Sequence, residues 1–116
     1  MKPENLLFSD NFVLKIVDFG FATPLEGRDG SGMNKTVLGT GGYMAPEIIE
    51  QKPYYALEAD VFALGVILFI MRSADKPFGL ARESDLKFYN LYRHRSELFW
   101  SDHQKGREEG FYSDDF

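Results

Sequence analysis

The run "EADVFALGVILFIMRS", residues 58–73, constrains what this sequence can fold into more than any other stretch. Its central part, Val61 to Met71, is apolar at nearly every position, so a helix formed here has no polar face to turn toward water. The apolar run is too short to span a bilayer. We therefore expect a core helix over residues 60–73 that protein surrounds on all sides, with Asp60 where the helix begins.

Two short apolar runs near the amino terminus predict a small antiparallel hairpin. They cover residues 6–8 and 12–17, and the intervening Ser-Asp-Asn segment favours a turn because such side chains bond nearby backbone. The second strand leads into the tripeptide DFG at 18–20, where Gly20 can take a backbone conformation that other residues avoid. Residues 23–36 then turn polar and rich in glycine, which predicts a long loop.

The remaining elements are expected to be mainly helical. A short helix over 45–51 tolerates Pro46 in its first turn. Residues 83–94 predict an amphipathic helix, and its buried stripe is either Leu86, Tyr89 and Tyr92 or Phe88 and Leu91. Residues 96–116 are interpreted as a loop region with aromatic anchors, in which the last four residues favour the start of another helix.

Composition excludes several classes of protein. Apolar residues make up 44% of the chain, too many for a disordered acidic tail. The 13 basic and 18 acidic residues give a net charge of -5, which disfavours a nucleic-acid or anionic-membrane partner. No cysteine is present, so disulfides are excluded, and the first residues lack the pattern of a signal peptide. We expect an intracellular, cytoplasmic segment without a membrane partner.

Two histidines invite a metal-site interpretation that their spacing does not support. His94 and His103 lie on different predicted elements, and no third ligand stands at a suitable distance along the sequence. We interpret both as ordinary surface or helix-end histidines.

Three separated motifs carry a family resemblance: "KPEN" at 2–5, "DFG" at 18–20 and "APE" at 45–47. In this order, with a strand before the second and a glycine-rich loop after it, they resemble the C-terminal lobe of a eukaryotic serine/threonine protein kinase, closest to the calcium/calmodulin-dependent branch. The resemblance implies an α+β fold that is mainly helical, with a small antiparallel β-hairpin and a long activation loop. Residues 1–116 would then run from midway through the catalytic loop to the start of the helix after the substrate-facing one.

This resemblance implies phosphoryl transfer from ATP with Mg²⁺ to a protein hydroxyl. A triphosphate carries several negative charges, which divalent cations held by oxygen ligands offset. Asp18 matches the carboxylate that binds magnesium, and Asn5 matches the amide that binds the second metal. Lys2 matches the lysine that neutralises the transferring phosphate. Without the other motifs, Asp18 could cap a turn and Asn5 could be a turn former.

The same resemblance implies substrate-facing and structural residues. Thr40 matches the threonine that bonds the catalytic aspartate and lysine, and Tyr43 lies where the acceptor pocket is shaped. Thr36 matches a position phosphorylated in many relatives, although it could be an ordinary exposed loop threonine. Glu47 matches a glutamate that pairs with an arginine from a later helix. Asp60 matches the aspartate that holds the catalytic loop by its backbone amides, with a plain helix N-cap as the alternative.

The family pattern places other essential groups before Met1. These include the aspartate that accepts the substrate proton and the lobe that covers the ATP, so we expect the 116 residues alone to be inactive and marginally stable. The alternative is a non-catalytic, kinase-derived interaction module, with residues 83–103 binding a regulatory partner, or a decayed gene fragment. Intact Lys2, Asn5, Asp18 and Thr40 favour a working kinase, because a scaffold has no need of metal ligands.

Overall fold

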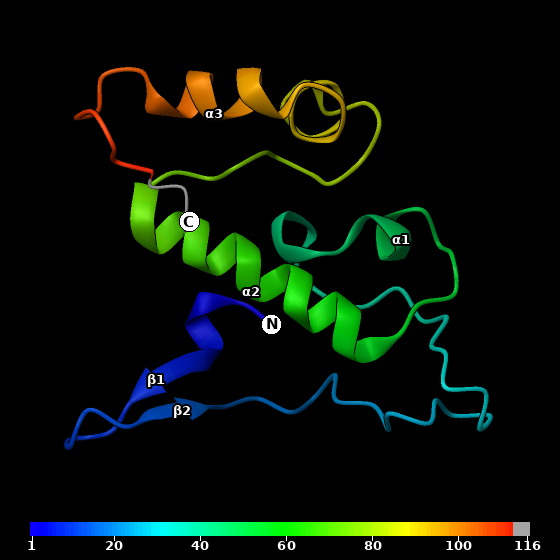
Figure 1. The fold of residues 1–116 in the computed structure, drawn as a ribbon. Coiled ribbons are helices and arrows are strands. Elements are labelled where there is room, and N and C mark those ends of the chain that lie inside the picture. The colour runs from blue at the N-terminus through cyan, green and yellow to red at the C-terminus, as the bar shows by residue number, and fades with distance from the viewer. Residues whose placement is uncertain (113–116) are drawn as a thin grey trace.

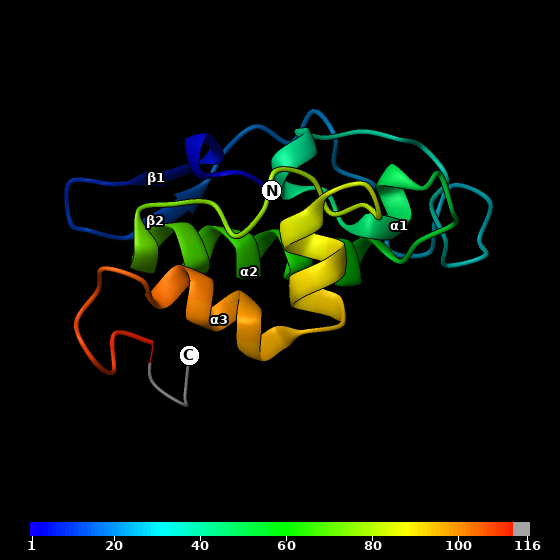
Figure 2. The same ribbon diagram turned by 90° about the horizontal axis from the view of Figure 1, so that it is seen from above.

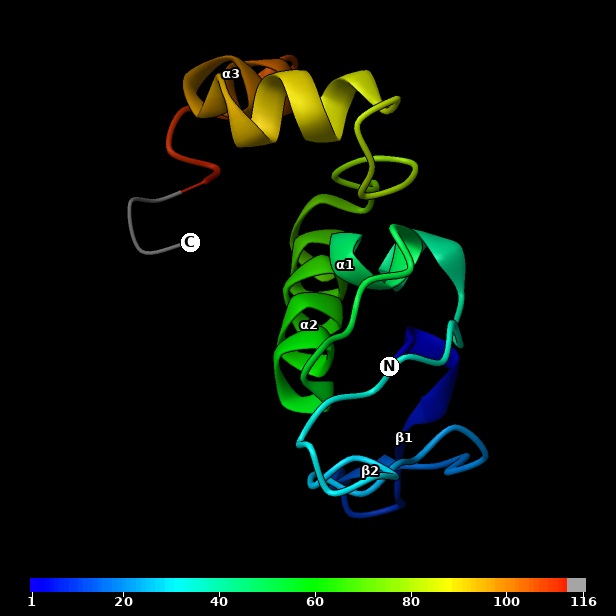
Figure 3. The same cartoon turned by 90° about the vertical axis from the view of Figure 1, so that its right-hand side faces the viewer.

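A computed structural model describes residues 1–112, and its central element is the apolar helix α2, Ala56–Ser73. The N-terminal hairpin lies on one side of α2, and the C-terminal helices lie on the other (Figure 1, Figure 3). The short helix α1, Pro46–Ile49, lies beside α2. The helix start expected at 113–116 lies outside the described residues. No helix within residues 1–112 has the length and apolar character needed to cross a membrane.

The predicted hairpin is confirmed, with a shorter second strand. Strands β1, Leu6–Phe8, and β2, Leu14–Ile16, pair antiparallel, with Leu6 opposite Ile16 (Figure 2). The turn between them is held by Ser9, whose amide donates to the Val13 carbonyl at 3.0 Å. This two-stranded sheet is the only one among the described residues. The coarse expectation, a partly helical chain with a small antiparallel sheet, is therefore correct.

Helix α2 begins before Asp60. Its N-cap is Tyr55, and its C-cap Ala74 takes a left-handed conformation with φ 53°. The N-cap interpretation of Asp60 is wrong, because favourable helix formers from Ala56 onward extend the helix by about one turn. Gly65 lies within α2, and a Cβ placed there would meet no described atom within 4 Å outside the neighbouring backbone of the helix.

One face of α2 is buried and another is exposed. The buried face includes Ala63, Val66, Ile67 and Phe69. The expectation of protein on all sides fails over a continuous apolar stripe whose side chains are 40–74% exposed: Leu57, Val61, Leu64, Leu68 and Met71. These positions recur every three or four residues, so they share one face of the helix. None of the described elements covers that face.

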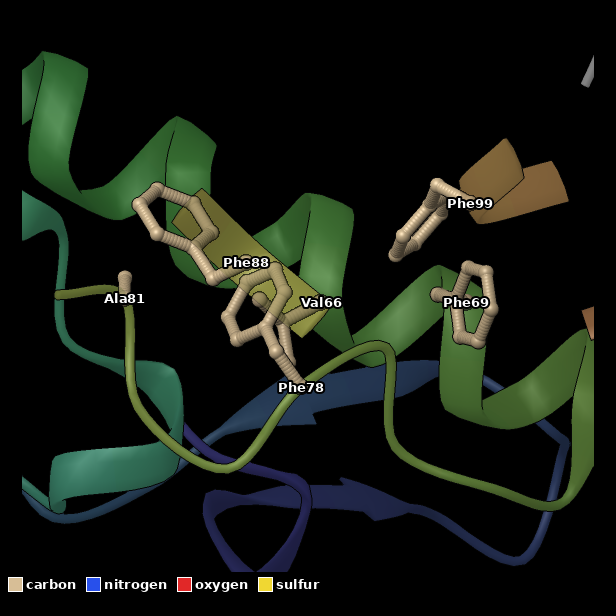
Figure 4. Close-up of a cluster of buried hydrophobic side chains, with 6 residues drawn as sticks. All are labelled: Val66, Phe69, Phe78, Ala81, Phe88 and Phe99. Atoms are coloured by element: carbon tan, nitrogen blue, oxygen red, sulfur yellow. The ribbon is translucent and has the colours of Figure 1, made fainter. Parts of the chain in front are cut away.

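An aromatic cluster joins α2 to the C-terminal part of the chain. Phe78 and Phe88 meet edge to face with ring centroids 4.7 Å apart, next to Val66 (Figure 4). Phe99 approaches Phe69 of α2 at 5.9 Å. Full burial of such a side chain contributes roughly 1.5–3 kcal/mol, so these rings hold the C-terminal helices against α2.

The C-terminal region departs most from expectation. The amphipathic segment forms a wide π-type helix, η3, Leu86–Arg93, and its buried residue is Phe88 rather than the 72%-exposed Leu86. Of the two predicted buried stripes, the one with Phe88 and Leu91 therefore agrees better with the structure. Residues expected to form a loop contain helix α3, Ser96–Gln104. Its Phe99 and His103 lie one turn apart and face the core together.

The two histidines differ from each other. His94 is exposed at the C-cap of η3, as expected. His103 is only 6% exposed, so the surface alternative is wrong for it, whereas the helix-end alternative is correct, because it lies in the last turn of α3. Its Nδ1 lies 2.8 Å from the Phe99 carbonyl oxygen, and its ring packs edge to face on Phe69.

The long loop predicted over residues 23–36 is confirmed by the absence of helix or strand there. Gly27 is required in it, since its φ is 71° and a Cβ would lie 2.5 Å from the Met33 carbonyl oxygen. Near its end Asn34 forms an isolated antiparallel bridge with Tyr54. The loop therefore has one defined attachment to the segment that leads into α2.

Asp85 fixes the approach of the chain to η3, and this yields a pH-dependent prediction. Its carboxylate accepts hydrogen bonds from the amides of Gly79, Leu80 and Phe88 at 2.9, 2.9 and 3.0 Å. Burial by itself raises the pKa of Asp85, but these amides outweigh it, and the pKa is lowered. We expect Asp85→Ala to lower the free energy of unfolding in urea by about 1–3 kcal/mol at neutral pH.

The sign of the pH effect follows from the lowered pKa. The carboxylate stabilises the fold fully above its unfolded pKa of about 3.9, and this contribution is lost as pH falls through the lower folded value. The difference between the wild type and Asp85→Ala should therefore shrink below about pH 4. Asp10→Ala, in the exposed hairpin turn, is the matched control. If the difference in unfolding free energy between the wild type and Asp85→Ala did not change with pH, the hydrogen-bonded carboxylate would not be its cause.

Substitution of Gly65, unlike that of Asp85, is expected to raise the free energy of unfolding. Because Gly65 lies inside α2 with open space where a Cβ would stand, Gly65→Ala should raise the free energy of unfolding by about 0.5–1 kcal/mol. Gly30→Ala, at φ 75°, should lower it instead. Urea unfolding of both variants measures whether the free energy of unfolding rises or falls relative to the wild type. Destabilisation by Gly65→Ala would mean that something packs closely on this face of α2.

Candidate functional site

A cleft of about 430 Å³ lies between the hairpin, the loop before α1 and the first half of α2. Six of the residues selected from the sequence line it: Lys2, Asn5, Asp18, Thr40, Tyr43 and Asp60. Thr36 and Glu47 are not among its lining residues. These six residues therefore line one continuous cleft, and their functional roles stay predictions.

The KPEN segment reaches the cleft through a tight turn. Residues Pro3–Asn5 form the 3-10 turn η1, in which the Asn5 amide donates to the Lys2 carbonyl at 3.1 Å. The Asn5 carbonyl in turn accepts from the Val17 amide at 2.9 Å. This bond continues the β1–β2 ladder by one pair, so Asn5 lies opposite the residue that precedes Asp18. The hairpin thus brings the two expected metal ligands to the same end of the sheet.

Asp18 occupies an unusual backbone conformation. Its φ is 62°, in the left-handed region that few residues other than glycine adopt. Its Oδ1 accepts from the Gly20 amide at 3.1 Å, a local bond of the kind that lets aspartate tolerate this region. Within residues 1–112 the second carboxylate oxygen makes no hydrogen bond, and Asp18 lines the cleft.

The role expected for Gly20 is corrected by this geometry. Gly20 is not among the glycines with positive φ, and Asp18 takes the left-handed conformation instead. A Cβ on Gly20 would stand 3.1 Å from the Asp18 Oδ1, closer than an ordinary contact. A side chain at this position would require the Asp18 carboxylate to shift by a few tenths of an ångström.

The opposite wall of the cleft comes from the glycine-rich turn before α1. Gly41–Tyr43 forms a second 3-10 turn, η2, with Thr40 as its N-cap. The Thr40 side chain makes no capping bond, so its hydroxyl is not occupied by the turn. Burial, and then the charge of Glu4, raises the pKa of Tyr43. Tyr43 lines the same cleft as Lys2 and Asn5 of the KPEN turn.

Asp60 and Glu47 occupy different positions around this site. The Asp60 carboxylate is 57% exposed and lies 3.6 Å from the amino group of Met1, which places α2 beside the KPEN segment. An ion pair of this exposure contributes little to stability. Glu47 lies half-buried in the first turn of α1, and none of the described residues forms an ion pair with it.

Thr36 lies on the loop that leads to η2 and is exposed. Its carbonyl accepts a hydrogen bond from the Tyr54 hydroxyl at 3.0 Å. Tyr54 also lines the cleft and was not selected from the sequence, where it stands in an unremarkable connecting segment. No local pattern could have identified it, because its partners lie 18 and 20 residues away.

The donor set of the cleft fits a hard divalent cation with a phosphate group. Asp18 offers a carboxylate oxygen and Asn5 an amide oxygen, and Mg²⁺ commonly takes one or two such protein ligands together with waters and phosphate oxygens. Lys2 adds a positive charge that suits a phosphate. Beside these polar groups stands an apolar wall that the sequence analysis did not select: Ile16, Leu38, Met44, Ile48 and Ala63.

Comparison with known proteins matches most of the chain to one family. The family model described as "Protein kinase domain" matches residues 1–110. CBL-interacting protein kinase 28 of Oryza sativa subsp. japonica is 44% identical over 93 residues, which cover 80% of this chain and 20% of that protein.

Two further relatives agree. CBL-interacting protein kinase 10 of Oryza sativa subsp. japonica is 39% identical over 102 residues, which cover 86% of this chain and 22% of that protein. CBL-interacting serine/threonine-protein kinase 2 of Arabidopsis thaliana is 38% identical over 93 residues, which cover 80% of this chain and 19% of that protein. The chain thus spans about a fifth of the length of these relatives.

Proposed function

Because this chain belongs to the protein kinase family and its relatives include serine/threonine kinases, we propose that it forms the floor of a Mg-ATP site in a serine/threonine kinase. The resemblance to the calcium-related branch fits these relatives as well. We place residues 1–116 in the C-terminal lobe, from midway through the catalytic loop onward. The observation that carries the proposal is the convergence of Lys2, Asn5, Asp18 and Thr40 in one cleft.

In this proposal Asp18 and Asn5 are the metal ligands. Bound Mg-ATP would supply the phosphoryl group and part of the charge neutralisation. Asp18 presents its free carboxylate oxygen, while the bond from the Gly20 amide to the other oxygen fixes the orientation of the side chain. Asn5 is held at the neighbouring position by the bond between its carbonyl and the Val17 amide.

Lys2 and Thr40 orient the reacting groups. Lys2 lines the same cleft as Asp18, and its ammonium group would neutralise charge on the transferred phosphate. Thr40 keeps its hydroxyl free of the η2 turn, so it can bond a catalytic-loop side chain. Tyr43 shapes the pocket for the acceptor residue of a protein substrate.

Thr36 is the proposed phosphorylation site of the activation loop. It is exposed, and a phosphate would add about -1.5 to -2 charges that arginines can bind. Glu47 and Asp60 are proposed to be structural: Glu47 as half of a buried ion pair, and Asp60 as the residue that holds the KPEN turn. Residues 83–103 are proposed as a regulatory surface, because η3 and α3 expose Leu86 and Leu98 by 72% and 50%.

The 116 residues do not contain the aspartate that would accept the substrate proton, so we expect no phosphoryl transfer from this chain in isolation. A non-catalytic interaction module is the alternative. The two accounts differ in what they require of the cleft, because only a kinase needs Asp18 and Asn5 to hold a metal.

A chimera tests the proposed function. Residues 1–110 replace the matching stretch of CBL-interacting protein kinase 28, and phosphate transfer from Mg-ATP to a serine/threonine peptide library is measured. We expect the chimera to be active, and Asp18→Ala to lower kcat by at least about 100-fold, because the carboxylate would hold the metal ion that neutralises charge in the transition state. Asp10→Ala, the same substitution at the far end of the hairpin, should leave kcat unchanged.

Metal binding to the chain itself distinguishes a failed chimera from a failed proposal. Mn²⁺ added to the ¹⁵N-labelled chain should broaden the amide signals of residues 5 and 18 first, and Asp18→Ala should abolish this selectivity. Broadening that favours other carboxylates, together with an inactive chimera, would support the interaction module instead.

A further inference from the structure

The glycine-rich loop and the residues that follow it are tied to the rest of the chain at one place. Most hydrogen bonds of residues 23–38 are internal, such as those from the Gly27 amide to the Pro24 carbonyl and from the Gly32 amide to the Glu26 carbonyl. Within residues 1–112, every hydrogen bond that leaves this segment ends on Tyr54.

Tyr54 makes three such bonds. Its carbonyl accepts from the Asn34 amide at 2.8 Å, and its amide donates to the Asn34 carbonyl at 2.9 Å. Its hydroxyl donates to the Thr36 carbonyl at 3.0 Å. The backbone pair and the side chain together bracket Lys35, which is exposed between the two attached residues.

The ring of Tyr54 connects these bonds to the core. It packs against the buried cluster formed by Ala45, Ile48 and Ala59, which belongs to α1 and the first turn of α2. Because the Tyr54 ring is already anchored in the core, its side chain loses little further conformational entropy when its hydroxyl bonds the loop. Burial, and then the charge of Asp60, raises the pKa of Tyr54, so the phenol stays protonated and can donate.

We propose that Tyr54 is the positioning residue that clamps residues 34–36 to the core and thereby presents the Thr36 side chain to solvent. The significance of Thr36 as a phosphorylation site rests on the proposed function. The clamp itself does not, because it is a statement about the conformation of this chain.

Tryptic cleavage tests the clamp at one peptide bond. Trypsin cuts after Lys35, inside the clamp, and after Arg28, which is exposed in the same loop but outside it. Cleavage requires local opening, so its rate follows the population of the open form when opening is fast. The ratio of the Lys35 rate to the Arg28 rate therefore reports on the clamp and not on global stability.

Tyr54→Phe removes only the hydroxyl that bonds Thr36. We expect it to raise the ratio roughly 2- to 12-fold, the effect of losing one ordinary hydrogen bond. Tyr55→Phe is the matched control, because Tyr55 is adjacent, 45% exposed and without a hydroxyl bond to any described residue. Its ratio should equal that of the wild type.

Several results would overturn the proposal. An unchanged ratio in Tyr54→Phe would show that the hydroxyl does not hold the loop. An equal rise at Lys35 and Arg28, or a similar rise in Tyr55→Phe, would assign Tyr54 a general role in stability. Hydrogen exchange of the wild type adds a second measurement: the amides of Asn34 and Tyr54 should be protected relative to those of residues 28–30, and equal exchange would contradict the backbone pair. None of these results depends on phosphoryl transfer.

Discussion

The antiparallel register of the first hairpin is the constraint on which the arrangement of the cleft depends. Leu6 lies opposite Ile16, and the bond from the Val17 amide to the Asn5 carbonyl extends the ladder to the edge of the site. Asp18 therefore emerges next to the turn that carries Asn5. A slip of one residue would exchange the two faces of each strand and move these side chains apart. Both strands have only three residues, so this site depends on few backbone bonds.

Helix α2 provides the second constraint, and with one apolar face exposed the chain is less compact than an ordinary domain of its length. The radius of gyration is 15.9 Å, against about 13.4 Å for a compact domain of this length. The accessible surface is 8234 Å², against about 6,450 Å² for a compact monomer of this mass. The excess agrees with the exposed stripe from Leu57 to Met71 and with the exposed hairpin side chains Phe8 and Phe12. Marginal stability of the isolated chain follows from this shape and stays a prediction.

Sequence patterns predicted those features that local chemistry determines. Apolar continuity located α2, two short apolar runs around a polar turn located the hairpin, and the family resemblance selected six residues that meet in one cleft. Helix α3 was missed because its core face uses His103, which a polarity pattern assigns to the surface. The left-handed conformation was expected at Gly20 and occurs at Asp18, since a side-chain hydrogen bond compensates there. The attachment through Tyr54 joins segments distant in sequence, so no local pattern encodes it.

Engineered cysteine pairs measure the hairpin register most directly, because the chain has no cysteine of its own. Leu6 and Ile16 face each other between the backbone-bonded pairs, where opposed side chains are closest. The account predicts that Leu6→Cys with Ile16→Cys oxidises readily to a monomeric disulfide. Leu7→Cys with Ile16→Cys should not, since these side chains point to opposite faces of the sheet. If the second pair forms the disulfide and the first does not, the register, and with it the placement of Asn5 beside Asp18, is wrong.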